Sequence, residues 1–271
     1  MKFGFIGFGE VSYTLSKILL ALDFEVLSSY EGRSKKTQDL IKSLDVSVLD
    51  SFEDLARESD VLISANSPQI ALDIAKDYAC LTKGFFLDFN NISPSTVFEI
   101  EKISNDNFID SAIFGRVNSN ELNIFLSGAN AQELLDNIHD ELSSKGINID
   151  DYEDFKINIK VISDKIGDVS KLKMLRSSYT KGVSALLIET FEAAQKLDLE
   201  NELWDVLSLT ENRDFEKSSK SRINSSYNSS KRKYEELLEV LDFLDDVDSD
   251  DDSKIMAKAI KDKFMYLSKK Q

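Results

Sequence analysis

The apolar residues of the first 150 positions form short runs, which are separated by segments with helical periodicity. Seven such runs predict strands, at residues 2–6, 25–29, 46–49, 61–65, 85–89, 108–113 and 123–127. Between them, amphipathic patterns such as 69–78 and 94–103 predict helices. Strands that alternate with crossover helices indicate a parallel sheet covered on both faces. We therefore predict an α/β doubly wound fold for this part of the chain.

The strand pattern ends near residue 164, and the remaining chain has the periodicity of helices. We predict one long helix at 165–197 and shorter helices near 199–207, 214–228, 230–244 and 253–267. Two domains follow from this change: a sheet domain at residues 1–160 and an all-α domain at 161–271. The acidic run 245–252 is expected to be a solvated loop, since it lacks the glycine and terminal glutamate of a calcium-binding loop.

Composition narrows the possible functions. The formal net charge of −16 argues against a nucleic-acid partner, because nucleic acids favour basic surfaces. One cysteine, Cys80, excludes an intrachain disulfide framework, and we expect it to be a small core residue. One histidine, His139, leaves no histidine cluster for a metal, and its apolar neighbours place it on a helix surface. We find no signal-peptide pattern and no membrane-spanning run, so we expect a cytoplasmic protein.

The first strand is followed directly by the most informative motif, Gly7-Phe8-Gly9-Glu10-Val11. A strand that breaks at such a turn and continues as a helix points backbone N–H groups, and the positive end of the helix dipole, at an anion. This arrangement is typical of dinucleotide-binding Rossmann domains, although a lone Gly-x-Gly also occurs in ordinary tight turns. Ser12 stands where the motif has its third glycine, and serine is small enough for close packing of helix on strand.

The loop after the second strand, residues 30–36, should meet the adenosine ribose of a dinucleotide. Glu31 could bind the 2′-hydroxyl of NAD, whereas Gly32, Arg33 and Ser34 could hold the 2′-phosphate of NADP. Two lysines follow, and no other role for Arg33 is visible in the sequence. We therefore expect NADP rather than NAD; the alternative is a solvated turn of mixed charge.

The only two prolines of the chain mark two further loops. Pro68 and Pro94 each open a predicted helix just after a strand, and capping residues precede both. Helix capping alone would account for this pattern. Because both loops lie at the same sheet edge as the glycine turn, we also expect ligand contacts there. The residues expected to bind the cofactor in these loops are Asn66, Ser67, Pro68 and Asn90.

One face of the long helix carries polar and basic residues and lies opposite a mainly apolar side. At 100° per residue, this stripe contains Lys173, Arg176, Ser177, Thr180, Lys181 and Ser184. A polar stripe usually faces solvent. Here, however, the stripe holds no acidic partner before Glu189, which favours an anionic ligand. Clustered cations also lower the pKa of a lysine, so that it can accept a proton near neutrality.

Taken in order, these segments resemble the β-hydroxyacid dehydrogenase and phosphogluconate dehydrogenase superfamily over nearly the whole chain. The similar segments are the glycine turn, the loops 66–68 and 88–94, and the segment 108–115, after which Ser127-Gly128 matches a strand-ending glycine. The run K-M-L-R-S-S-Y-T-K-G at 173–182 is similar to a poorly characterised branch of the superfamily.

The resemblance implies an NADP-dependent oxidoreductase that transfers a hydride between NADP and a small anionic 3-hydroxy acid or its keto form. It implies Lys173 as general acid/base, six residues after Gly167, and Ser177 as a catalytic residue where the superfamily has asparagine. Val169 also departs from the superfamily, which has glycine there. Residues that would then bind the substrate are Asn91, Ser93, Ser111, Arg176 and Lys181.

The resemblance also implies a homodimer that forms through the helical domain, and a further substrate-binding lysine near Lys231-Arg232-Lys233. No metal site is expected. Two other functions stay open. An imine reductase would require an acidic or aromatic proton donor in place of Lys173. An NADP-binding regulatory protein without turnover is compatible with the change at Ser177.

Overall fold

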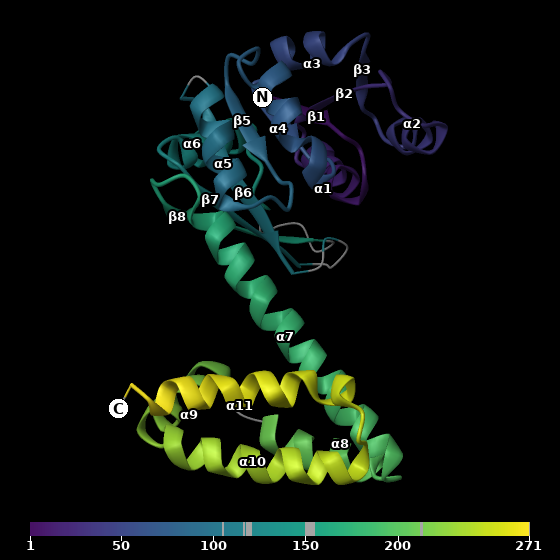
Figure 1. Cartoon of the computed structure of the whole chain (residues 1–271). Coiled ribbons are helices and arrows are strands. Elements are labelled where there is room, and N and C mark those ends of the chain that lie inside the picture. Colours follow the sequence, from purple (N-terminus) through teal and green to yellow (C-terminus); the bar gives the residue numbers. More distant parts are fainter. Residues whose placement is uncertain (105, 116, 118–120, 150–154, 212–213, 271) are drawn as a thin grey trace. The chain divides into compact units, whose positions relative to one another are not determined.

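An eight-stranded sheet forms the centre of the N-terminal part of the chain in the computed structural model (Figure 1). Its strand order is β3-β2-β1-β4-β5-β6-β7-β8. The strands are β1 (Lys2–Ile6), β2 (Glu25–Ser29), β3 (Ser47–Leu49), β4 (Val61–Ser64), β5 (Phe85–Asp88), β6 (Phe108–Phe114), β7 (Glu121–Ser127) and β8 (Lys156–Ser163). The structure describes all residues except 105, 116, 118–120, 150–154, 212–213 and 271.

The helices of this part cover both faces of the sheet, as the doubly wound prediction requires. They are α1 (Glu10–Ala21), α2 (Lys35–Lys42), α3 (Phe52–Glu58), α4 (Ala71–Ile74), α5 (Pro94–Ile103) and α6 (Ala131–Ser144). A short 3₁₀ turn, η1 (Pro68–Ile70), leads into α4, and a π turn, η2 (Ala75–Ala79), follows it. Phe3 and Phe5 of β1 pack in one apolar core with α1 and α6, whereas Ile6 packs in a second core with α3 and α5.

All seven predicted strands are present, with ends that agree to within two residues. The prediction missed β8, whose alternation of polar and apolar residues lies beyond the 150 residues assigned to strands. The expectation of a wholly parallel sheet is also wrong: β7 runs antiparallel to β6, and β8 runs parallel to β7. An antiparallel neighbour needs only a short connection instead of a crossover helix.

The chain divides into two compact units, Met1–Arg176 and Ser177–Gln271, which we call the sheet unit and the helical unit. The division falls inside the long helix α7 (Asp168–Lys196). The helical unit continues with α8 (Glu200–Glu211), α9 (Phe215–Asn228), α10 (Ser230–Val247), the 3₁₀ turn η4 (Asp251–Lys254) and α11 (Ile255–Ser268). None of the described helices is both long and apolar enough to cross a membrane.

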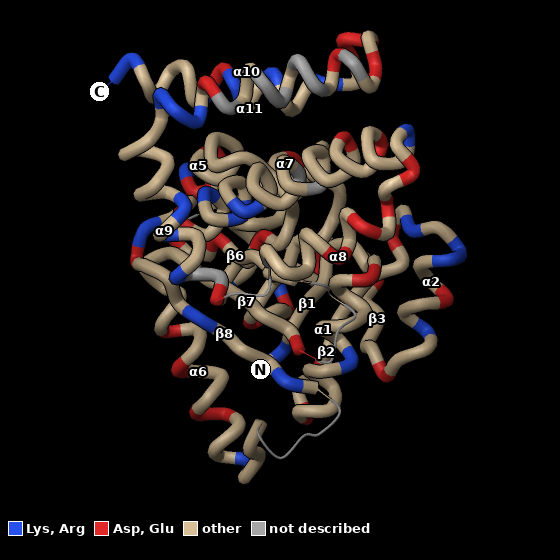
Figure 2. Tube along the Cα trace, turned by 90° about the horizontal axis from the view of Figure 1, so that it is seen from below, with Lys and Arg blue, Asp and Glu red and all other residues tan. Residues whose placement is uncertain are grey.

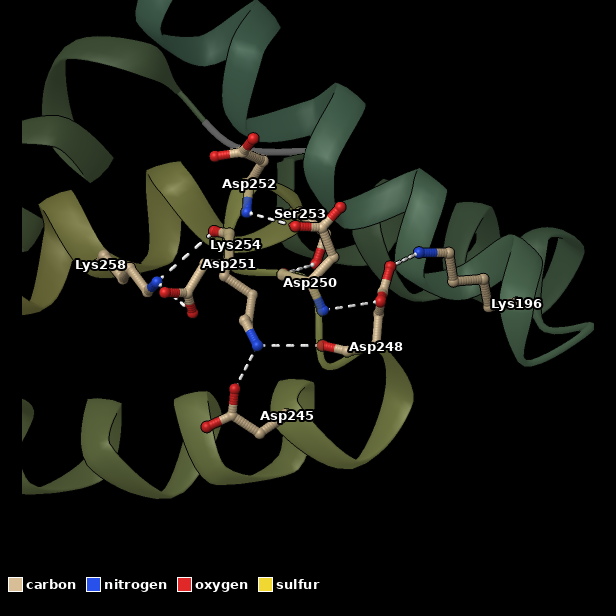
Figure 3. A network of polar contacts seen from close by, with 9 residues as sticks. All are labelled: Lys196, Asp245, Asp248, Asp250, Asp251, Asp252, Ser253, Lys254 and Lys258. Carbon is tan, nitrogen blue, oxygen red and sulfur yellow. Dashed lines mark hydrogen bonds and ion pairs between the residues drawn. The ribbon is translucent and has the colours of Figure 1, made fainter.

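The acidic run 245–252 spans the end of α10, the turn after it and the start of η4. Among its described carboxylates, those of Asp245, Asp248 and Asp251 pair with lysines (Figure 3). Lys254 is only 1% exposed and bonds to Asp245 and to the backbone oxygen of Asp248 at 3.0 Å. Lys196 of α7 pairs with the Asp248 carboxylate. Figure 2 shows that other acidic residues are spread along most of the helices. Most described residues of the run are exposed, as expected of a solvated segment, and these ion pairs brace it.

The predictions for the single histidine and the single cysteine of the chain have different outcomes. His139 is exposed on α6, which confirms the prediction of a helix-surface residue. Cys80 is exposed rather than buried, so the expectation of a core residue is wrong. Its thiol donates a hydrogen bond to the Ile103 carbonyl at 2.7 Å, which links the end of η2 to the end of α5.

Candidate functional site

The glycine turn has the geometry that an anion-binding turn requires. Gly7 has a φ of +92°, and a Cβ atom there would lie 2.4 Å from the backbone oxygen of Ala65. Gly9 is the N-cap residue of α1 and has no side chain that could cap the helix. A Cβ atom added at Gly9 would have no neighbouring atom within 4 Å. The N–H groups of the first turn of α1 therefore border open space.

Ser12 performs the packing role of the third glycine. Its side chain is fully buried, and its hydroxyl donates a hydrogen bond of 2.7 Å to the Gly7 carbonyl. The serine therefore fixes the turn against the start of α1 without pushing the helix away from β1.

A cavity of about 560 Å³ opens at this edge of the sheet, and it brings together loops that are far apart in the sequence. Such a volume lies in the range of small-molecule and cofactor sites. Its walls come from the glycine turn, the loops after β2, β4 and β5, and the first turns of α7. They comprise Gly7, Phe8, Gly9, Glu10, Val11, Arg33, Thr37, Ala65, Asn66, Pro68, Phe89, Asn90, Asn91 and Lys173.

Asn66 and Asn90 join two of these loops through their side chains. The Asn66 amide donates to the Ile6 carbonyl at 2.6 Å, and its backbone N–H donates to the Asn90 side-chain oxygen at 2.5 Å. The Asn90 amide nitrogen in turn donates to the Ser64 hydroxyl at 2.9 Å and to the Asp88 carboxylate at 2.6 Å. Asn90 is buried, and its side chain is hydrogen-bonded within the protein. It therefore shapes the cavity wall mainly by fixing the position of the neighbouring loop.

Arg33 and Glu31, which gave conflicting signals in the sequence, have separate positions in the structure. The Glu31 carboxylate accepts the backbone N–H of Phe52 at 2.7 Å, so it caps the start of α3. The Arg33 guanidinium lies 4.8 Å from the centre of the Phe52 ring and donates to the Glu31 carbonyl at 3.1 Å. Arg33 lines the cavity while the Glu31 carboxylate is engaged elsewhere.

The neighbours of Arg33 complete this loop. Gly32 has a φ of +60°, a left-handed conformation that glycine adopts without strain. The Ser34 hydroxyl accepts the Thr37 N–H at 3.3 Å and caps α2. The Ser34 side chain is therefore hydrogen-bonded to the first turn of α2, and it is exposed beside Arg33.

Two buried carboxylates lie in adjacent strands next to the cavity. Asp88 ends β5, Asp110 lies in β6, and the two residues are register partners. Burial raises the pKa of Asp88 to about 6, although hydrogen bonds from Asn90 and Ser64 oppose the shift. Burial also raises the pKa of Asp110, against hydrogen bonds from Ser170, Ser127 and Gly167.

Lys173 reaches the cavity from the second turn of α7 and is half-buried. Burial lowers the pKa of its amine, whereas the charges of Asp88 and Asp110 act to raise it. The lowered pKa agrees with the prediction, but its expected cause is wrong. Neighbouring cations are not among the causes, and the carboxylates that act on the amine belong to β5 and β6 rather than to α7.

The remaining predicted residues have mixed positions. Asn91 lines the cavity, Ser67 is exposed just before Pro68, and the Ser93 hydroxyl accepts the Thr96 N–H at 3.4 Å as the cap of α5. Ser111 is buried in β6, where its hydroxyl donates to the Ile109 carbonyl at 3.2 Å. The structure therefore does not gather Asn91, Ser93 and Ser111 into one cluster.

Among the other residues of the predicted stripe on α7, only Arg176 belongs to the sheet unit. Arg176 is the last residue of that unit and is exposed, and Ser177 is the first residue of the helical unit. The side chain of Lys181 lies outside the described residues. Lys173 is thus the one member of the stripe that the structure brings to the cavity among the residues it describes.

Sequence reasoning assigned no role to several residues of the site. Thr37, Ala65 and Phe89 line the cavity, and Asp88 and Asp110 lie buried next to it. The two aspartates were visible as single acidic residues inside apolar runs, F-F-L-D-F and F-I-D-S-A, which is the available signal for a buried charge.

This combination of a doubly wound sheet, a glycine turn and a loop-lined cavity defines a dinucleotide-binding class of protein. In agreement, residues 2–88 match the family of NADP oxidoreductases described as coenzyme F420-dependent. An uncharacterised 28.5 kDa protein from the 7S RNA 5′ region of Methanothermus fervidus is 40% identical over 268 residues, which cover 98% of this chain and 99% of that protein.

The solved structures give the same result. A conserved protein of unknown function, whose structure revealed similarity with 3-hydroxyacid dehydrogenases, is 38% identical with a TM-score of 0.64, covering 99% of this chain and 98% of that one. An imine reductase from Myxococcus stipitatus in complex with NADP⁺ has a TM-score of 0.71 at 13% identity, covering 99% and 94%. The chain belongs to the NAD(P)-binding superfamily that contains the 3-hydroxyacid dehydrogenases, which are oxidoreductases.

Proposed function

We propose that the protein is an NADP-dependent oxidoreductase that interconverts a small anionic 3-hydroxy acid and its keto form, with Lys173 as general acid/base. The observation that carries this proposal is that Lys173, the glycine turn and Arg33 line the same cavity of the sheet unit. A nucleotide held by the turn and a substrate held near Lys173 would then share one site.

The residues of the cavity fit the proposed cofactor. The open N–H groups at the start of α1 suit a pyrophosphate, and the empty space above Gly9 is space that a Cβ atom would occupy. The Arg33 guanidinium, supported by the Phe52 ring, suits the 2′-phosphate that distinguishes NADP from NAD. The Asn66 to Pro68 loop and Asn90 would border the nicotinamide half. When bound, the nicotinamide would accept or supply the hydride.

Lys173 would carry the proton transfer. A neutral amine at this position can accept the proton of a substrate hydroxyl, and the ammonium can return it to a carbonyl in the reverse reaction. Burial favours the neutral form, and the carboxylates of Asp88 and Asp110 favour the charged form. Burial is the larger of these effects, so the pKa of the amine lies below its ordinary value. Asn91, which lines the same cavity, and Arg176, the last residue of the sheet unit, would be candidates for binding the substrate.

The other two functions are weaker. An imine reductase would need an acidic or aromatic proton donor at the cavity, and the position is occupied by Lys173. A regulatory NADP-binding protein would keep the glycine turn and Arg33 without turnover. Turnover distinguishes these two functions from the main proposal. An imine reductase would turn over imines, and a regulatory protein would turn over no substrate.

A screen of small hydroxy acids for NADP reduction, followed by nicotinamide absorbance, tests the proposal. On any substrate found, Lys173→Ala should lower kcat by about 10²- to 10⁴-fold, which is the usual contribution of a general acid/base. Lys171→Ala is the matched control, since Lys171 is exposed on the same helix and pairs with Asp168 at 2.9 Å. Near-normal turnover by Lys173→Ala would remove the assigned role, and turnover of imines alone would favour the second function.

We also propose a cytoplasmic homodimer that forms through the helical unit. This unit exposes large apolar side chains, including Ile188 (59% exposed), Trp204 (57%) and Leu209 (79%), which a second copy could cover. Light scattering of the purified protein should give twice the 30.6 kDa mass of the chain. Ile188→Asp should shift the mass toward that of one chain, whereas Gln195→Asp on the same helix should not.

A further inference from the structure

A row of polar side chains crosses the sheet next to the cavity. Ser64 is the register partner of Asp88, Asp88 of Asp110, and Asp110 of Ser127, on four neighbouring strands. Register partners project to the same face of a sheet, so their side chains lie side by side. Asp88 and Asp110 are each only 2% exposed, and Ser64 and Ser127 are fully buried. A buried row of this kind is costly unless each member has partners.

The Asp88 end of the row is connected to the cofactor loops. One carboxylate oxygen of Asp88 accepts the backbone N–H of Asn90 at 2.9 Å, and the other accepts the Asn90 amide at 2.6 Å. Since Asn90 also holds the backbone of Asn66, Asp88 fixes both loops that border the cavity.

The Asp110 end of the row is connected to α7. The two carboxylate oxygens of Asp110 accept the hydroxyl of Ser170 at 2.6 Å and its backbone N–H at 3.0 Å. The Ser127 hydroxyl accepts the backbone N–H of Val169 at 3.2 Å. These bonds satisfy N–H groups of the first turn of α7, which a helix start otherwise leaves without partners.

Lys173 lies one helical turn after Ser170, so the bonds that hold Ser170 also set the direction in which Lys173 projects. Among the described residues, Asp88 and Asp110 are the charged groups that act on its amine. A buried amine without such neighbours would lose its proton readily. Two adjacent carboxylates in turn repel each other, and a cation beside them relieves that repulsion.

Building on the proposed function, we propose that Asp88 and Asp110 are positioning residues for Lys173, which fix the cavity loop and the start of α7 around it and favour its ammonium form until a ligand enters. The two carboxylates do not line the cavity and would not touch the substrate; they act through Lys173, Asn90 and the start of α7. The protonation state of the general acid/base would thus depend on the carboxylates of the sheet as well as on burial.

The test measures the pKa of Lys173 directly, without substrate or cofactor. Reductive methylation with ¹³C-formaldehyde labels the lysines, the signal of Lys173 is assigned by its loss in Lys173→Arg, and its shift is followed against pH by NMR. Asp110→Asn is the gentler variant, since an amide nitrogen in place of Oδ1 can donate to the Ser170 hydroxyl, while the amide oxygen still accepts the Ser170 N–H and the Ser127 hydroxyl. Asp88→Asn is the second variant. The matched control is Asp168→Asn, which removes a half-buried carboxylate from the same end of α7.

We expect the pKa of Lys173 to fall in Asp110→Asn and in Asp88→Asn, to fall further in the double variant, and to stay unchanged in Asp168→Asn. Circular dichroism and thermal melting check that each variant is folded. A purely structural role would leave the titration of Lys173 in place in a folded variant, and an unchanged pKa in either folded single variant would overturn the proposal. An equal fall in the control would also overturn it.

This outcome is separable from that of the proposed function. If no hydroxy acid is turned over but the pKa of Lys173 falls as expected, the carboxylate pair retains its role and the assigned reaction is wrong. If a hydroxy acid is turned over and the pKa does not respond, the reaction stands and the carboxylate pair does not. With a substrate available, the pH profile of kcat should move to lower pH in Asp110→Asn.

Discussion

At the scale of single residues, the two glycines of the opening turn have different tasks. Gly7 is required by the fold, because its φ of +92° and the nearby Ala65 oxygen leave no room for a side chain. Gly9 has an ordinary φ of −95° and open space above it, so the fold does not require it. Its smallness matters only if something approaches the backbone there.

This difference gives a paired prediction. Gly7→Ala should lower the free energy of unfolding by about 2–4 kcal/mol, through backbone strain and overpacking. Gly9→Ala should leave stability within about 0.5 kcal/mol of the original and yet weaken NADP binding by at least about 10-fold, because the Cβ atom would occupy the phosphate space. Urea unfolding and calorimetric titration measure the two effects. Full NADP affinity in Gly9→Ala would mean that the turn holds no phosphate.

Arg33 should decide between NADP and NAD. The loss of a charge-assisted hydrogen-bond pair to a phosphate costs about 1.5–3 kcal/mol, so Arg33→Ala should weaken NADP binding by about 10- to 100-fold and leave NAD binding almost unchanged. Lys36→Ala is the control, because Lys36 is exposed in the first turn of α2 and does not line the cavity. Stabilisation of the unaltered protein by NAD but not by NADP in a thermal shift assay would contradict the NADP preference.

At the scale of elements, the start of α7 depends on contacts with two strands rather than on its own caps. Gly167 precedes the helix with a φ of +90°, and a Cβ atom there would lie 2.9 Å from the Phe98 ring. Asp110 and Ser127 then accept the N–H groups of the first turn. The helix therefore begins where β6 and β7 provide acceptors for it.

Ser127→Ala should consequently lower the free energy of unfolding by about 1–3 kcal/mol, since it leaves the buried N–H of Val169 without an acceptor. Amide exchange at Val169 should become faster than at residues in the middle of α7. Ser163→Ala is the comparison, because the Ser163 hydroxyl bonds to the half-buried carboxylate of Asp168 at 2.8 Å and accepts the N–H of the exposed Lys165 at 3.2 Å, and water can reach both groups. Equal losses in both variants would mean that the first turn is held by other contacts.

The elements also show what could be predicted from the sequence. The seven strands could be predicted because burial leaves a local pattern of apolar residues. The glycine turn could be predicted because its backbone geometry leaves a local motif. The role of Asp88 and Asp110 was not predictable in this way. Their burial could be inferred from the apolar runs that contain them, but their adjacency depends on the register between β5 and β6, which no local pattern records. For the same reason the sequence indicated Lys173 as a basic residue on a stripe and not as the partner of two carboxylates.

At the scale of the whole molecule, the buried carboxylates should leave a trace in the pH dependence of stability. The pKa of Asp88 is about 6 in the folded protein, against 3.8 for an unperturbed aspartate. Between these two values the folded state binds more protons than the unfolded state. Stability therefore falls as pH rises from about 4 to about 6, and the loss persists at higher pH.

Other groups contribute with the opposite sign, since hydrogen bonds to lysines lower the pKa of Asp168 and Asp248. Those groups are present in both the original protein and Asp88→Asn, so they cancel when the two are compared.

A shift of about 2 pKa units corresponds to about 3 kcal/mol. The stability of the original protein relative to Asp88→Asn should therefore fall by up to about 3 kcal/mol between pH 4 and pH 7, as measured by urea unfolding. The broken hydrogen bonds to Asn90 add a constant offset that does not vary with pH. Parallel stability curves would mean that Asp88 has the same proton affinity in the folded and unfolded chain, and that its burial is offset entirely by its partners.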